Sequence, residues 1–274
     1  MPRPPMLNQL TTTFINRLRA NDQAAWYELW ETFGPVLRAQ LTKWGRGRIG
    51  PETVRDLSQE TLAALSDSID RYQPEKGARF STWLLAIAKH VLGDEMDRRS
   101  AQKRGGGAKR PASLDEQWMV ARDARVDEEY EAAMFRAKVE AAIRLVEKQC
   151  EFMDFSIFRM RVLDGKSGKE VAEAMGTSEP TVSRRLARVR DALRIRLREV
   201  IATYSFSDDE LQEAERNGLR LNPSKSDDRD RVRDAAPAAV SLDGQADALF
   251  DEAVGEIYRR QMELRDRERL IDER

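Results

Sequence analysis

Hydrophobic residues recur along most of the chain at the three- and four-residue spacing of an amphipathic helix, and no segment alternates convincingly as a strand would. In the N-terminal part this spacing predicts four helices. The first is short and capped by Thr12 or Thr13, the second begins at Asp22, the third runs from Pro51 to about residue 72, and the fourth from Phe80 to about residue 99. Short loops join them, which is typical of a helical bundle.

A second helical unit follows, with predicted helices at about 128–149, 151–163, 168–175 and 178–200. Beyond residue 204 the chain is polar, contains a run of alternating charges, and is predicted to be largely disordered. A last helix is predicted at about 245–270. It places five apolar side chains on one side: Ala246, Leu249, Phe250, Ala253 and Ile257.

These patterns predict an all-α fold of two small domains with an extension. The first domain covers residues 8–99 and the second 128–203, and residues 204–274 form the extension. Between the domains, residues 100–127 are predicted to be a flexible basic linker. The stretch 98–111 has three consecutive glycines among six basic residues, a composition that cannot form a packed core.

Charge is distributed unevenly, although the chain as a whole carries a formal charge of only −1. Residues 205–274 contain nineteen acidic and twelve basic side chains, a net charge of −7, so the remaining residues carry +6. A basic body with an acidic tail suits a protein that binds a polyanion and masks itself or binds a partner through the tail. The same charges could simply keep the protein soluble.

The segment 169–198 has the layout of a helix-turn-helix. A short helix ends at Gly176, which supplies the turn, and Ser178 is a suitable N-cap for the next helix. In that helix the apolar side chains share one side: Val182, Leu186, Val189 and Leu193. Thr181, Arg184 and Arg188 project from the opposite side, where arginine can bind guanine in the major groove.

Four further arginines of this helix are expected to neutralise DNA phosphates: Arg190, Arg194, Arg196 and Arg198. The alternative is an arginine-rich surface helix on an ordinary bundle. The combination of a short helix, a glycine turn, a capped helix and outward arginines favours DNA binding.

Three segments in this order resemble the sigma factors of bacterial RNA polymerase, in the extracytoplasmic-function (ECF) group. Residues 56–99, DLSQETLAALSDSIDRYQPEKGARFSTWLLAIAKHVLGDEMDRR, resemble sigma region 2, and 18–41 resemble the helix that opens it. Residues 158–197 resemble region 4. Pro180 stands where the family usually has a small residue and Ser183 replaces a common basic residue, which implies an altered promoter preference.

The resemblance implies a binding role for three groups of residues. The face that would dock on the clamp of the largest polymerase subunit comprises Asp56, Gln59, Glu60, Ala63 and Asp67. The residues that would bind the proximal promoter element, where family members capture a flipped base, are Lys76, Arg79, Thr82, Lys89, Arg98 and Arg99. Those that would bind the distal element are Ser178, Glu179, Thr181, Ser183, Arg184, Arg185 and Arg188.

The implied function is to direct polymerase core to promoters and help melt the DNA, in the cytoplasm, with an anti-sigma factor or regulator as a further partner. The C-terminal helix is expected to pack on one of the domains or bind a regulator, covering a DNA- or core-binding face; a solubilising appendage is the alternative. The rival functions are a stand-alone helix-turn-helix regulator and an interaction protein that does not bind DNA, such as an anti-sigma antagonist.

An enzyme is not expected, because one histidine, one cysteine and no phosphate-binding loop leave little from which to build a site. No metal site and no cofactor are predicted, since His90 and Cys150 cannot supply a zinc-ligand set. No apolar run is long enough to span a bilayer, so no membrane insertion is expected.

Overall fold

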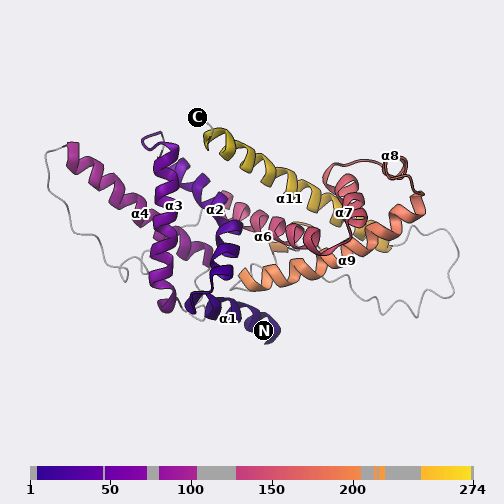
Figure 1. The fold of residues 1–274 in the computed structure, drawn as a ribbon, viewed down its shortest axis with the longest axis horizontal. Coiled ribbons are helices and arrows are strands. Elements are labelled where there is room, and N and C mark those ends of the chain that lie inside the picture. The colour runs from indigo at the N-terminus through magenta and orange to yellow at the C-terminus, as the bar shows by residue number, and fades with distance from the viewer. Residues whose placement is uncertain are drawn as a thin grey trace. The chain divides into compact units, whose positions relative to one another are not determined.

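The computed structural model describes residues 5–45, 47–72, 80–103, 128–204, 213–214, 216–219 and 242–272. Every regular element within these ranges is a helix, which confirms the predicted all-α fold (Figure 1). The chain forms two compact units. The first comprises Met1–Ala137, Thr203–Ser207 and Glu263–Arg274, and the second comprises Lys138–Ala202 and Asp208–Met262.

The first unit contains four long helices and the beginning of a fifth. They are α1 (Pro5–Arg19), α2 (Gln23–Gly45), α3 (Pro51–Ser68), α4 (Phe80–Lys103) and the start of α6 (Glu128–Gln149). The 3-10 turn η1 (Ile69–Arg71) ends α3. Helices α2, α3 and α4 pack against one another, and α1 packs against α2 (Figure 1). The four-helix bundle expected from the sequence is therefore present.

Aromatic side chains dominate the centre of this bundle. Phe80 and Trp83 at the start of α4 are 2% and 6% exposed, so they belong to the core. The ring of Trp83 stacks on Tyr72 with centroids 4.5 Å apart, and Phe80 meets the same tyrosine edge-on at 6.0 Å. On α6, Tyr130 is buried and donates from its hydroxyl to the carbonyl oxygen of Ser81, which ties this helix to α4.

Two predicted helix limits in the first unit are wrong. The first helix begins at Pro5, so Thr12 and Thr13 lie inside it and do not cap it. Helix α4 continues to Lys103, so the first residues of the predicted flexible stretch are helical, because its helix-breaking glycines begin only at Gly105. The rest of the predicted linker lies outside the described residues. The predicted start at Asp22 is confirmed, since its Oδ1 accepts from the amide of Ala24 at 2.9 Å.

The second unit contains the rest of α6 and the helix-turn-helix. Its further elements are α7 (Phe152–Phe158), the π-helical turn η3 (Arg159–Leu163), α8 (Gly168–Ala174), nearly all of α9 (Glu179–Tyr204) and much of α11 (Leu242–Asp272). The apolar side predicted for α9 is confirmed, because Val182, Leu186, Val189 and Leu193 are all at most 3% exposed. The C-terminal helix was predicted at about the observed position.

The buried side of α11 differs from the predicted one. It consists of Phe250, Val254, Ile257 and Gln261, which recur at helical spacing and are all buried. Leu249, which was expected on this side, is 48% exposed. Along the helices that the structure describes, no stretch is both long and apolar enough to cross a membrane.

Candidate nucleic-acid interface

Helix α8 and the turn after it have strong local signals. The hydroxyl of Ser167 accepts from the amide of Glu170 at 3.2 Å, and the Glu170 carboxylate accepts from the amide of Ser167 at 2.7 Å. This capping box has a sequence signature, Ser-x-x-Glu, which was not among the predicted helix caps. Gly176 has a φ of 60°, which glycine adopts without steric cost, so the predicted turn is confirmed.

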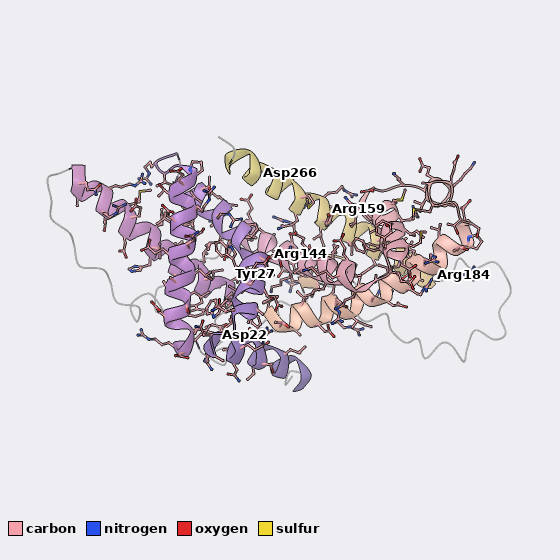
Figure 2. The ribbon with its side chains drawn as sticks, in the orientation of Figure 1. Asp22, Tyr27, Arg144, Arg159, Arg184 and Asp266 are labelled. Carbon is pink, nitrogen blue, oxygen red and sulfur yellow. The ribbon has the colours of Figure 1, made fainter. Side chains whose placement is uncertain are left out.

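Helix α9 turns a polar side outward from the domain core. Ser178, Glu179, Ser183, Arg184 and Arg188 are exposed, and Thr181 is half-buried. Ser178 precedes the helix as predicted, and its hydroxyl lies 3.0 Å from that of Thr181. Figure 2 shows Arg184 near the N-terminal end of α9. Donors on this side are available to base edges or phosphates of a duplex.

A buried carboxylate on α7 holds two arginines of α9. Asp154 has a side chain that is 8% exposed, and it accepts a hydrogen bond from Arg185. Its second oxygen lies 3.6 Å from Nε of Arg188, whose side chain is 62% exposed. Arg185 is therefore engaged with the domain, whereas Arg188 remains largely accessible. The role of Asp154 has no signal in the sequence, because it depends on α7 packing beside α9.

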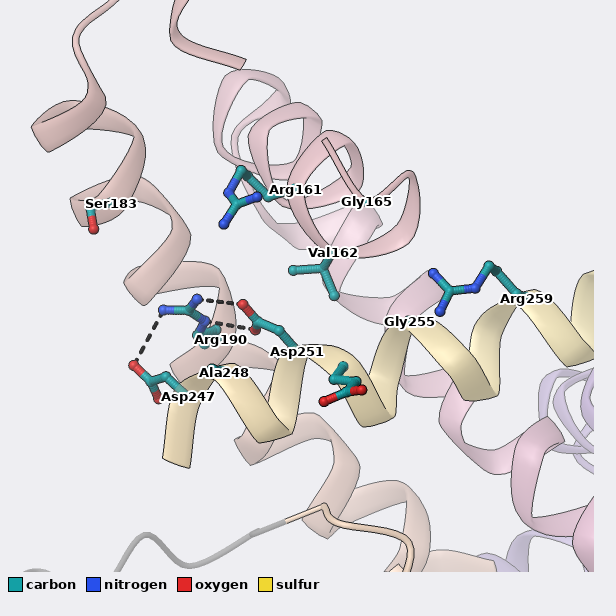
Figure 3. Close-up of a pocket in the computed structure, with 11 residues that line it drawn as sticks. Arg161, Val162, Gly165, Ser183, Arg190, Asp247, Ala248, Asp251, Gly255 and Arg259 are labelled. Atoms are coloured by element: carbon teal, nitrogen blue, oxygen red, sulfur yellow. Dashed lines mark hydrogen bonds and ion pairs between the residues drawn. The ribbon is translucent and has the colours of Figure 1, made fainter. Parts of the chain in front are cut away.

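The C-terminal helix occupies another side of α9 (Figure 3). Nε of Arg190 donates to Asp251 at 2.7 Å, and a second guanidinium nitrogen lies 3.2 Å from Asp247. Arg194 donates to the other oxygen of Asp247 at 2.6 Å, and its guanidinium carbon lies 4.6 Å from the ring centroid of Phe250. Charge pairs and a cation–π contact thus join α11 to α9.

The arginines in this contact are removed from solvent, with side chains only 13% and 8% exposed for Arg190 and Arg194. Burial would lower the pKa of Arg190, but the hydrogen bond and charge of Asp251 outweigh it and raise the pKa above its ordinary value. The prediction that these two arginines contact DNA phosphates is therefore corrected, because their guanidinium groups pair with Asp247 and Asp251 of α11. Arg196 also has protein partners, Gln149 and Glu199.

An open hollow of about 460 Å³ lies along the same seam. Figure 3 shows that Arg161 and Val162 line it from η3, Ser183 and Arg190 from α9, and Asp251 from α11. Ser183, a predicted distal-element residue, therefore lies beside the seam with α11.

In the first unit, α3 carries the face expected to dock on polymerase. Asp56, Gln59, Glu60, Ala63 and Asp67 are all exposed, while Leu57, Thr61 and Leu65 on the opposite side are buried. The hydroxyl of Thr61 is satisfied within the helix, donating to the carbonyl of Leu57 at 2.7 Å. Helix α3 thus presents an acidic and amide-bearing surface.

The basic end of α4 is organised by Glu95, whose side chain is 8% exposed. It accepts from Arg98 at 2.7 Å and from Arg99 at 2.6 Å, and Arg99 also donates to Thr53 at 2.9 Å. Desolvation alone would raise the pKa of Glu95, but the hydrogen bonds and charges of the two arginines outweigh it and lower the pKa. Arg98 keeps 62% of its side chain exposed.

Of the other residues predicted to bind the proximal element, Thr82 and Lys89 lie on α4. Lys89 is exposed and its Nζ lies 5.3 Å from the ring centroid of Trp44, and Thr82 is half-buried. Lys76 and Arg79 lie outside the described residues. Among the residues that the structure does describe, no group of His, Cys, Asp and Glu side chains gathers that could hold a metal ion.

Two protein-family models match this chain, one within each unit. The family model for sigma-70 region 2 matches residues 29–102, and that for sigma-70 region 4 matches residues 154–193. Two mycobacterial proteins are each 30% identical over 138 residues: a "Probable RNA polymerase sigma-C factor" of Mycobacterium bovis and an "ECF RNA polymerase sigma factor SigC" of Mycobacterium tuberculosis. The matched part covers 50% of this chain and 66% of each relative, just under two thirds of their length.

Proposed function

We propose that the chain is a sigma factor of the sigma-70 family, in its extracytoplasmic-function group, which binds RNA polymerase core, directs it to specific promoters and helps melt the DNA. The observation that carries this proposal is the presence of both sigma regions, in order, on one chain. A stand-alone helix-turn-helix regulator would account for residues 154–193 but would leave the region 2 match without a function.

In this proposal the second unit binds the distal promoter element as a duplex. Helix α9 enters the major groove through Thr181, Arg184 and Arg188, with Ser178, Glu179, Ser183 and Arg185 around them. The exposure of Arg184 and Arg188 supports this assignment, because a guanidinium group needs free access to bind a guanine edge bidentately. Because Arg185 donates a hydrogen bond to Asp154, its role is to hold α9 against α7 more than to contact DNA.

The first unit would bind polymerase and the proximal element. The exposed face of α3, with Asp56, Gln59, Glu60, Ala63 and Asp67, is an acidic surface that complements a basic coiled coil. Thr82, Lys89, Arg98 and Arg99 on α4, together with Lys76 and Arg79, would grip the proximal element and stabilise its melted strand.

The chain performs no covalent chemistry in this proposal, because RNA synthesis belongs to the polymerase. It acts in the cytoplasm, where promoter DNA is transcribed. An anti-sigma factor or another regulator is a further partner that we propose from the family resemblance.

Run-off transcription with purified core polymerase and a genomic fragment library of the source organism tests the proposal. We expect discrete transcripts that depend on both the chain and core, and that disappear with the Arg184→Ala/Arg188→Ala variant. A chain that fails to associate with core lacking its own specificity subunit would contradict the proposal. Tight binding to a duplex without core, and no transcripts, would favour the stand-alone regulator.

A further inference from the structure

The contact between α11 and α9 lies on a particular side of the DNA-reading helix. At about 100° per residue, Ser183, Arg190 and Arg194 fall on one side of α9. Arg184 and Arg188 lie about 120° and about 160° around the axis from Arg190. The carboxylates of α11 pair with Arg190 and Arg194, and Arg184 and Arg188 stay exposed. Helix α11 therefore covers a flank of α9 and leaves its DNA-reading side open.

The fit of α11 depends on shape as well as on charge. Within the second unit, Phe250 and Val254 of α11 are fully buried. The next residue, Gly255, approaches η3 so closely that a Cβ atom there would lie 2.5 Å from the carbonyl oxygen of Val162. A side chain cannot enter that space without a shift of the backbone. Paired charges, a buried apolar strip and a glycine contact occur together along one seam, as in a specific interface.

We propose that α11 is a lateral brace of the DNA-reading helix, with Asp247 and Asp251 as positioning residues that act through Arg190 and Arg194. The two carboxylates compensate arginines that are otherwise nearly buried, so removing them leaves uncompensated charge beneath α11. Helix α9 then loosens against α7 and η3, and DNA must order it again on binding, which weakens affinity. Only this last consequence rests on the proposed function.

The brace makes a prediction opposite to that of a mask. A masking helix competes with DNA, so its removal strengthens binding. A bracing helix holds the reading surface in place, so its removal weakens binding. The positions of Asp247 and Asp251, on the flank rather than over Arg184 and Arg188, favour the brace.

The test uses the full chain and two readouts. Hydrogen exchange of the backbone amides at 186–195 reports on α9 without any DNA. Fluorescence anisotropy measures binding to a duplex recovered in the transcription experiment. For Asp247→Asn/Asp251→Asn we expect α9 to exchange roughly tenfold faster and the duplex to bind about fivefold more weakly, between the small effect of losing an exposed ion pair and the large effect of losing a fully buried one. The matched control is Glu256→Gln, an exposed carboxylate of α11 that pairs with Arg260 in the same helix.

A charge-swapped variant separates positioning from general loss of stability. Arg190→Asp and Asp251→Arg should each raise exchange in α9, and the double variant should recover much of the protection. Lack of recovery, exchange that is unchanged in the amide variants, or tighter duplex binding would each overturn the brace. If no duplex is recovered, the proposed function fails, while the exchange measurements still decide on the brace.

Discussion

The guanidinium group of Arg185, on α9, donates to the buried carboxylate of Asp154 on α7. The same carboxylate lies 3.6 Å from Arg188, whose side chain is largely exposed. One buried acid thus connects α9, which we propose reads DNA, to α7, which packs beside it. Asp154 therefore holds both Arg185 and Arg188 in place, while the side chain of Arg188 still faces solvent.

Replacing Asp154 with asparagine should weaken both the domain and its binding to DNA. The isosteric change removes the charge that compensates Arg185, so we expect a loss of about 1–3 kcal/mol in the free energy of unfolding of the second unit. Denaturant unfolding and duplex anisotropy measure the two effects. Glu151→Gln is the control, because that carboxylate is 76% exposed and lies 3.7 Å from Arg185. Equal behaviour of the two variants would contradict the role of Asp154.

Alanine at Arg184 or Arg188 should reduce duplex affinity and leave folding intact. Each arginine is exposed on the side of α9 that we propose reads DNA, and loss of a guanine contact costs about 1–3 kcal/mol of binding free energy. Competition with mutated duplexes should show relaxed specificity at one base pair for each variant. The control is Arg260→Ala, which removes the same charge from an exposed position on α11 and should bind like the wild type. If all three variants lost affinity equally, these arginines would contribute only charge.

Glutamine at Glu95 should destabilise the first unit at neutral pH. The pKa of Glu95 is lower in the folded protein than its ordinary value. Its charged form therefore stabilises the fold above the ordinary pKa of a glutamate, about 4.3, and this contribution is lost as the pH falls through the lower folded value.

We expect Glu95→Gln to lower the free energy of unfolding at pH 7 by about 1–3 kcal/mol. In acid, where Glu95 of the wild type is protonated, the difference in free energy of unfolding between the two proteins should become smaller. Thermal unfolding between pH 3 and about pH 7 follows this difference across the relevant pKa range. Asp97→Asn, an exposed neighbour on α4, is the matched control. If the stability difference between Glu95→Gln and the wild type did not change with pH, the ion pairs of Glu95 would not be its cause.

Charge reversal on α3 should separate polymerase binding from DNA binding. Asp56→Lys/Asp67→Lys changes two exposed side chains and leaves the buried side of the helix untouched. We expect core affinity to fall by at least about tenfold, since like charges then face each other across the interface. Binding of the distal duplex should not change. Asp97→Lys, an exposed carboxylate on α4, lies outside the proposed face and tests whether charge alone matters.

Alanine at Gly255 should destabilise the second unit, although alanine ordinarily stabilises a helix interior by about 1 kcal/mol relative to glycine. The new methyl group would lie 2.5 Å from the carbonyl oxygen of Val162, so α11 must move outward. Thermal unfolding and hydrogen exchange of α9 measure the change. A variant more stable than the wild type would mean that the close approach is not required for α11 to dock.

The sequence predicted the elements whose signals are local. The apolar spacing of Val182, Leu186, Val189 and Leu193 predicted which side of α9 is buried, and Gly176 predicted the turn. Spacing along one helix is enough for such predictions, because a side chain's direction follows from its position in the turn.

Contacts between helices could not be predicted in this way. The sequence presents Arg190 and Arg194 as two more cations on a basic helix, and only the packing of α11 assigns them to Asp247 and Asp251. Likewise, Leu249 and Val254 both fit an apolar strip, and the partner surface determines that Val254 is buried and Leu249 exposed. The roles in binding DNA and polymerase stay predictions until they are measured.

The caps around α8 have a consequence for how this protein can vary. With only seven residues, α8 is too short to persist without its neighbours, and it is fixed by the Ser167–Glu170 box at one end and the left-handed Gly176 at the other. An inserted or deleted residue between these points would rotate everything downstream by about 100°, turning Arg184 away from the groove that we propose it enters. Family members should therefore differ in residue type here far more readily than in length.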